Sequence, residues 1–209
     1  MFLRKKQKVF CIGRNKTGLT SLGQALEGFG YKLGNQRKSE LLLDDWAKKD
    51  FAKIIRHCRT ADAFKDVPFS LDHTFEIVDQ AFPGSKFILS VRENAAEWYD
   101  SHIRYDTRAL GKGRLPVADD LKSYTYRKPG WYWQLHQYVY HIDESTLYDR
   151  DTYIKHYENY NRNVIEYFKN RPDDLLVINL KDDNAMEKLC NFLNIKYAGR
   201  SMPHLNKSA

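Results

Sequence analysis

Cysteine is scarce in this sequence, and a long apolar run is absent from it. The three cysteines, Cys11, Cys58 and Cys190, lie far apart, and each sits in an apolar stretch. Their odd number and wide spacing predict reduced core thiols and a reducing compartment, and they give no metal-binding signature. No segment is apolar enough to span a membrane, and the basic N-terminus leads directly into a predicted strand without the apolar stretch of a secretion signal. We therefore expect a soluble, cytoplasmic protein.

Internal repeats and low-complexity segments are also absent, so a single domain over residues 1–209 is the natural interpretation. With 42% hydrophobic and 14% aromatic residues, a chain of this length can bury one sizeable core. The formal net charge of +7 predicts an acidic partner, such as a nucleotide, a sulfated or phosphorylated substrate, or a nucleic acid. The basic residues are dispersed and no nucleic-acid motif accompanies them, so we do not expect a nucleic-acid partner. The oligomeric state stays open.

Predicted strands alternate with predicted helices along the chain. Strands are expected at 8–12, 86–91 and 175–180, with weaker candidates at 31–33 and 61–64. Helices are expected at 22–29, 39–57, 71–82, 95–104, 131–142, 152–168 and 185–193, with a long loop at 107–130. This alternation predicts a three-layer α/β/α fold with a central, mostly parallel sheet like that of P-loop nucleoside triphosphatases. Residues 107–150 would be an insertion that forms a lid or acceptor region.

Ligands of such sheets bind at the carboxyl ends of the strands. Four polar or glycine positions follow predicted strands and should share one crevice: Gly13, Asp66, Arg92 and Lys181.

A glycine loop connects the first predicted strand to the first helix. Such a loop directs backbone N–H groups and the positive end of the helix dipole at one anion. The spacing Gly13-x4-Gly18 is that of a P-loop, but Leu19 stands where a nucleoside triphosphatase has lysine. The hydroxyl survives as Thr20, whereas the lysine has moved into the loop as Lys16. That placement suits the 5′ end of a nucleotide with one 5′-phosphate and a transferable group.

The motif Gly13-x-x-Lys16-Thr17-Gly18-x-Thr20-Ser21 resembles the phosphosulfate-binding loop of the sulfotransferases. That family uses 3′-phosphoadenosine 5′-phosphosulfate (PAPS) and releases adenosine 3′,5′-bisphosphate. The resemblance implies that Lys16 neutralises charge on the bridging oxygen as the sulfuryl group leaves, and that no metal is needed. The donor-binding residues it implies in this loop are Arg14, Asn15, Lys16, Thr17, Gly18, Leu19, Thr20 and Ser21.

Arg92 ends the strand at 86–91, where a P-loop hydrolase often has an aspartate that supports Mg²⁺. A cation at this position suits an anionic ligand. In sulfotransferases an arginine after this strand and a serine on the next helix hold the 3′-phosphate, and Arg92 and Ser101 resemble that pair. The C-terminal segment also resembles the end of many sulfotransferases, which implies that Arg200 and Lys207 contact the nucleotide.

A general base should deprotonate the acceptor. Asp66 precedes Val-Pro68 after the predicted strand at 61–64, where cytosolic sulfotransferases carry a catalytic histidine, so the resemblance implies Asp66 as the base. An aspartate is a weaker base unless burial raises its pKa, which leaves His73 as the second candidate. The remaining motif-free histidines are predicted to be structural, namely His102, His136, His141 and His156.

The aromatic-rich stretch at 124–148 is predicted to be mostly core, with an acceptor pocket as the alternative. Together these features predict a PAPS-dependent sulfotransferase that acts on a hydroxyl or amine of a small-molecule or glycan acceptor. A P-loop nucleotide or small-molecule kinase and a non-catalytic nucleotide-binding module are the alternatives. The sequence leaves the identity of the acceptor open.

Overall fold

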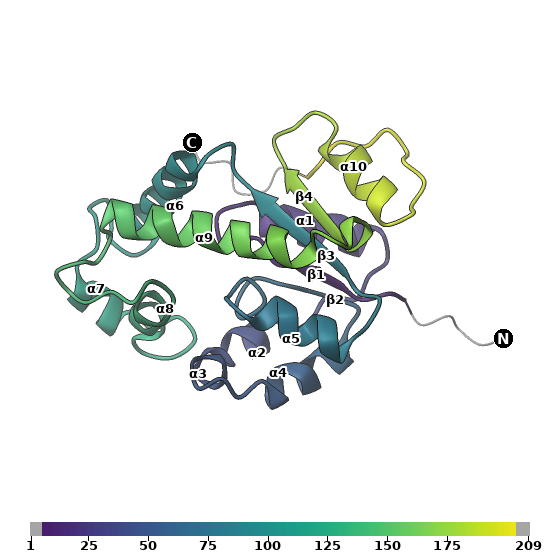
Figure 1. Ribbon diagram of the computed structural model, residues 1–209. Helices are drawn as coiled ribbons and strands as arrows, with labels where there is room; N and C mark the ends of the chain where they lie inside the picture. The colour runs from purple at the N-terminus through teal and green to yellow at the C-terminus, as the bar shows by residue number, and fades with distance from the viewer. Residues whose placement is uncertain (1–5, 204–209) are drawn as a thin grey trace. The chain divides into compact units, whose positions relative to one another are not determined.

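The computed structural model describes residues 6–203, and its chain divides into two compact units (Figure 1). One unit comprises the residues up to Arg92 together with those from Asn161 onward, and the other is Glu93–Tyr160. The second unit is wider than the predicted insertion at 107–150. The interpretation of the whole chain as one domain stays a prediction.

The first unit is built on a four-stranded sheet in which every strand pair is parallel. The strands are β1 (Val9–Cys11), β2 (Ala63–Lys65), β3 (Lys86–Val91) and β4 (Leu175–Asn179). Their spatial order is β2-β1-β3-β4, so neighbouring strands are joined by crossovers that carry helices. The predicted fold class, an α/β protein with a central parallel sheet flanked by helices, is confirmed.

One face of this sheet is covered by aliphatic side chains. Val9, Cys11 and Ile88 point toward α1 (Leu19–Gly28) and α10 (Ala185–Phe192), whose buried residues complete the same core cluster. Burial raises the pKa of the Cys11 thiol to about 12, which keeps this cysteine neutral. The prediction of a buried core cysteine at this position is therefore confirmed.

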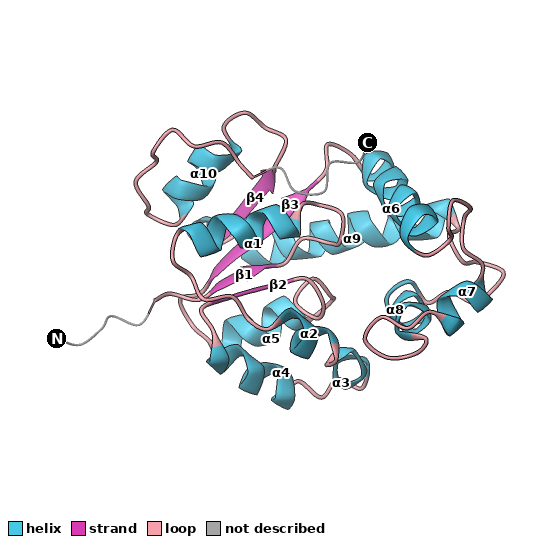
Figure 2. Cartoon of the chain, turned by 180° about the vertical axis from the view of Figure 1, so that it is seen from behind, coloured by secondary structure: helices cyan, strands magenta, loops and turns pink. Residues whose placement is uncertain are grey.

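The opposite face is aromatic. Phe10 of β1 stacks between Phe64 of β2 and Phe87 of β3, with ring centroids 5.7 and 5.5 Å away. Phe168, at the end of α9 (Arg150–Phe168), packs on Phe87 at 4.7 Å, and α5 (Thr74–Ala81) contributes Phe75. Figures 1 and 2, which view the chain from opposite sides, show α1 and the end of α9 on opposite faces of the sheet.

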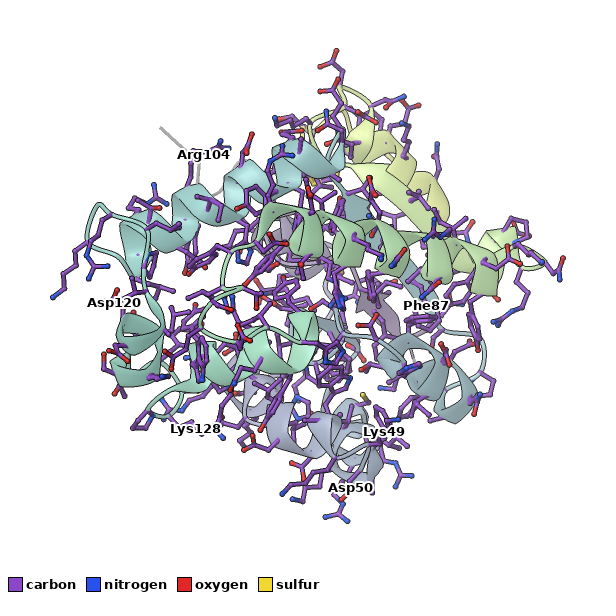
Figure 3. The ribbon with its side chains drawn as sticks, turned by 60° about the vertical axis from the view of Figure 1, so that its left-hand side comes forward. Lys49, Asp50, Phe87, Arg104, Asp120 and Lys128 are labelled. Atoms are coloured by element: carbon purple, nitrogen blue, oxygen red, sulfur yellow. The ribbon has the colours of Figure 1, made fainter. Side chains whose placement is uncertain are left out.

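The predicted helix at 39–57 is wrong, because three short helices occupy this stretch: α2 (Gln36–Glu40), α3 (Leu43–Ala47) and α4 (Ala52–His57). Asn35, and not Ser39, caps the first of them. Lys49 has a φ of 58°, which ends α3, and it lies with Asp50 at an exposed turn (Figure 3). The predicted strand at 31–33 is reduced to one bridge between Leu33 and Ala63.

The second unit is helical. It contains α6 (Ala95–Ala109), α7 (Ala118–Ser123), α8 (Trp131–Tyr140) and the first part of α9. The predicted loop at 107–130 therefore begins later than expected and contains a helix. Trp98 is fully buried and stacks on Tyr157 at 4.5 Å, and Tyr140 stacks on Tyr153 at 4.0 Å. The core interpretation fits Trp131, Tyr140 and Tyr148 of the aromatic-rich stretch, which are buried.

The regular elements of residues 6–203 also include the 3₁₀ turns Cys58–Thr60 and Pro172–Asp174. None of the helices in the described part of the chain has the length and apolar character needed to cross a membrane.

Candidate functional site

The loop between β1 and α1 is shaped by two glycines. A Cβ on Gly13 would lie 2.2 Å from Ser90 Oγ and 2.5 Å from the Ser90 carbonyl oxygen, so the loop backbone presses directly against β3. Gly18 has a φ of 96°, and a Cβ there would lie 2.5 Å from Leu180 Cδ1. Both positions therefore require glycine, which lets the main chain turn tightly into α1.

The N-terminus of α1 suits an anion. Gly18 is its N-cap, and within the described chain this cap makes no side-chain hydrogen bond and the first turn holds no acidic residue. The first N–H groups of a helix lack intrahelical acceptors, and the helix dipole makes this end positive. Thr20 is exposed in this first turn, and Ser21 is buried beside it. This arrangement is the one in which helix N-termini bind phosphate groups.

The buried Thr17 hydroxyl stabilises the loop through contacts with the loop backbone and with β3. It is 2% exposed, donates to the Arg14 carbonyl oxygen at 2.6 Å, and lies 2.6 Å from Ser90 Oγ. Its side chain is therefore committed to the loop and to β3. Any contribution of Thr17 to a ligand would therefore come from its backbone N–H.

Lys16 and Arg92 come together at the end of β3. The Arg92 Nε–H donates to the Lys16 carbonyl oxygen at 2.7 Å, and Lys16 has a φ of 66°. Both side chains are partly exposed. The hydrogen bond fixes the turn that carries Lys16 and places two cationic residues at the same edge of the sheet.

Arg14 behaves differently from the other loop residues. Its guanidinium is 2% exposed and donates from Nη1 to the Ser70 carbonyl oxygen and from Nη2 to Asp72 Oδ2, both at 3.0 Å. The side chain thus faces the segment after β2. This geometry does not favour a donor contact from the Arg14 side chain, and the predicted donor contacts of Arg14 and Asn15 stay predictions.

Both candidate bases follow β2. Asp66 is partly buried, has a φ of 62°, and accepts from the Val67 N–H through Oδ1 at 3.0 Å. His73 is the N-cap residue of α5, has a φ of 63° and a side chain that is 65% exposed, and places Nδ1 3.6 Å from Glu76 Oε1. The choice between the two residues therefore stays open.

The edge at which these residues meet follows from the sheet itself. Gly13, Asp66, Arg92 and Lys181 follow four strands that run parallel, so all four lie at one edge of the first unit.

The model of the sulfotransferase domain family matches residues 8–209, which is nearly the whole chain. The chain belongs to the sulfotransferase domain family. No curated protein matches it.

Three further predicted donor-binding residues lie elsewhere in the chain. Ser101 is buried on α6 in the second unit, so its pairing with Arg92 stays a prediction. Arg200 is exposed in the first unit. Lys207 lies outside the described residues. None of these three predictions is tested by the geometry.

The second unit contains a buried polar cluster that the sequence did not predict. Asp106 Oδ2 accepts from the Tyr148 hydroxyl at 3.0 Å and lies 3.3 Å from His102 Nε2 and 3.6 Å from His136 Nε2. Tyr153 bonds to the other side of the His136 ring, at Nδ1, at 2.7 Å. The i,i+4 spacing of His102 and Asp106 was the available signal, but the predicted helix at 95–104 ends before Asp106, whereas α6 extends to Ala109.

Burial opposes the charge of Asp106, but the interactions with His102, His136 and Tyr148 outweigh it and hold the pKa of this carboxyl below its usual range. Burial lowers the pKa of His136 to about 4, against the opposing pull of Asp106. The ligand-type atoms of His102, Asp106 and His136 lie within 4.8 Å of one another, so this group could hold a metal ion. The Tyr148 hydroxyl bonds to Asp106 and the Tyr153 hydroxyl bonds to His136, so two tyrosines supply hydrogen-bond partners that help to offset the burial of these polar groups.

Proposed function

We propose that this member of the sulfotransferase domain family transfers a sulfuryl group from PAPS to a hydroxyl or amine of a small-molecule or glycan acceptor. The observation that carries the proposal is the loop between β1 and α1. Gly13 leaves no room for a Cβ, Gly18 has a left-handed φ, the helix N-terminus has no side-chain cap in the described chain, and Arg92 holds the Lys16 turn. These features fit a nucleotide with a single 5′-phosphate and a transferable group.

Each residue then has a role that its position supports. The N–H groups at the start of α1, with Thr20 and Ser21, would hold the 5′-phosphate. Lys16 would neutralise the charge that develops on the bridging oxygen as the bond to sulfur breaks. Arg92 would bind the 3′-phosphate, and Asp66 or His73 would take the proton from the acceptor. Transfer exchanges the sulfur–oxygen bond of the donor for a bond to the acceptor oxygen or nitrogen.

The kinase alternative is less well supported by the same loop. A P-loop kinase needs a lysine after the second glycine to reach the β- and γ-phosphates. Leu19 occupies that position and is buried in the aliphatic core next to α10. Arg92 stands where an aspartate would support Mg²⁺. A turnover measurement distinguishes the proposal from the non-catalytic alternative, because a non-catalytic nucleotide-binding module would show no sulfuryl transfer.

The experiment is a calorimetric titration of adenosine 3′,5′-bisphosphate, with AMP and with ATP plus Mg²⁺ as comparison ligands. We expect a clear preference for the bisphosphate. Arg92→Ala should weaken its binding by about 10- to 100-fold, because hydrogen bonds to charged groups contribute about 1.5–3 kcal/mol each. Arg56→Ala, at an exposed position on α4, is the matched control and should bind as the wild type does.

Preference for ATP with Mg²⁺ would instead support the kinase alternative. Turnover is then measured with PAPS and a panel of phenol, amine and sugar acceptors. Lys16→Ala should lose most of the turnover while it still binds the bisphosphate, because the lysine acts on charge that develops only during transfer. Turnover unchanged in Lys16→Ala would refute the assigned role.

A further inference from the structure

The buried guanidinium of Arg14 joins two strand ends of the first unit. Arg14 belongs to the loop after β1, whereas its partners Ser70 and Asp72 follow β2. The Arg14 side chain is 2% exposed and that of Asp72 is 30% exposed, so the ion pair is largely withdrawn from water on the arginine side. A planar guanidinium that makes two hydrogen bonds in one plane also fixes the direction of both partners.

Hydrogen bonds extend this ion pair in both directions. On one side, the Asp72 carbonyl oxygen accepts from Trp46 Nε1 of α3 at 2.9 Å. On the other side, the Arg14 carbonyl oxygen accepts from the Thr17 hydroxyl, which lies 2.6 Å from Ser90 Oγ of β3. The loop is thus tied to α3, to the segment after β2 and to β3 by one continuous chain of contacts.

The burial of the Arg14 charge makes its partners important for the stability of the loop. A buried cation is stable only when an anion and hydrogen-bond acceptors compensate for its lost hydration. Loss of Asp72 would remove the anion with which this buried guanidinium is paired, and would weaken the compensation for its lost hydration. The acidic partner of this loop residue lies 58 residues farther along the chain.

We propose that Arg14 is a positioning residue whose ion pair with Asp72 holds the Gly13–Gly18 loop in its ligand-binding shape, without contact between the Arg14 side chain and the donor. The proposal rests on the proposed function for its ligand. It has a distinctive consequence: Asp72, an anion that would repel a donor phosphate if the two were in contact, is required for tight donor binding. We call this Arg14–Asp72 ion pair the clasp. It also holds Asp72, the residue directly before His73.

The test is calorimetric titration of adenosine 3′,5′-bisphosphate into Arg14→Met, Asp72→Asn and the double variant. If the pair acts as a clasp, each single change weakens binding by about tenfold and the double variant binds no more weakly than either, because both changes break one interaction. If Arg14 were a direct ligand, Arg14→Met alone would weaken binding and Asp72→Asn would leave it unchanged or tighter. That result, or wild-type binding in all three variants, overturns the proposal.

A second ion pair of the same unit provides the control. Lys53 and Asp45 are 2.7 Å apart, with the lysine largely exposed, so Lys53→Met and Asp45→Asn should bind the bisphosphate as the wild type does. Arg14→Lys tests whether the two-pronged hydrogen bonding of the guanidinium matters, because lysine keeps the charge but loses the planar pair of donors. We expect Arg14→Lys to bind the bisphosphate with an affinity between those of the wild type and Arg14→Met, and to unfold at a temperature close to that of the wild type. Full wild-type affinity would count against a role for the paired guanidinium donors.

Amide hydrogen exchange separates this proposal from the proposed function. If the wild type binds none of the nucleotides, the proposed function fails, but the clasp is still tested by the exchange of residues 13–18. We expect faster exchange there in Arg14→Met and in Asp72→Asn, and unchanged exchange in the Lys53→Met control. Unchanged exchange in the Arg14 and Asp72 variants would overturn the clasp.

Discussion

Replacement of Gly13 by alanine is the most direct way to test the packing of the donor loop. The new Cβ would lie 2.2 Å from Ser90 Oγ, 2.5 Å from its carbonyl oxygen and 2.8 Å from its nitrogen, whereas ordinary contacts are 3.4–4 Å. Two of these three atoms are backbone atoms of β3, in the middle of the sheet, so a rotamer change of Ser90 relieves only one contact. Overpacking of this kind costs about 1–3 kcal/mol, and we expect the upper part of that range.

Urea unfolding followed by circular dichroism measures this cost. Gly28→Ala is the matched control: the position ends α1, its new Cβ meets no atom within 4 Å, and the change should stabilise the protein by about 0.5–1 kcal/mol. Gly13→Ala should also weaken binding of the bisphosphate, because relief of the clash displaces the loop. A Gly13→Ala protein as stable as the wild type would refute the close packing of the loop on β3.

The remaining predictions concern buried groups. Asp106→Asn should cost about 3 kcal/mol in urea unfolding, because it breaks a buried charged network, whereas Asp100→Asn on the exposed side of α6 should stay within about 0.5 kcal/mol of the wild type. The pKa of His136 is lower in the folded protein, about 4, than its ordinary 6.5, so the unfolded chain binds the proton more tightly and stability falls as the pH drops from 6.5 to 4. The loss in the free energy of unfolding should reach about 3 kcal/mol at pH 4. Unfolding curves of His136→Gln should show a smaller loss, and an equal loss would contradict the assignment of this pH dependence to His136. Iodoacetamide should label Cys11 and Cys58 of the folded protein more than about 100-fold more slowly than in urea, since burial raises both pKa values to about 12; rapid labelling of the folded protein would contradict their burial.

Local patterns in the sequence predicted the scaffold of the site well. The strands at 86–91 and 175–180 and the helix after Gly18 follow from apolar runs and periodicity, which depend on neighbours along the chain. The same holds in part for the loop: Gly18 adopts a left-handed φ that glycine permits, whereas the need for glycine at position 13 comes from its contact with Ser90 of β3. The stretch at 39–57 shows where this reasoning stops: helical periodicity continues across two turns, and Lys49 adopts a left-handed conformation that its residue type does not predict.

Side-chain partners were harder to predict than the elements that carry them. Arg14 was grouped with the donor ligands because it lies in the glycine loop, yet its guanidinium pairs with Asp72. The cluster around Asp106 was missed because Tyr148 and His136 come from other segments and carry no motif. Burial of a charge is visible only after distant segments have packed around it.

The sequence by itself therefore determined the α/β class, the glycine loop with Lys16 and the cation at the end of β3, since backbone conformation and burial periodicity are set mostly by nearby residues. Only the tertiary structure decided that Arg14 braces the loop through Asp72 and that Asp106 lies at the centre of the second unit's polar cluster. Ion pairs and hydrogen bonds form between groups that the fold brings within about 3 Å, and this proximity depends on the packing of segments that are remote in the chain.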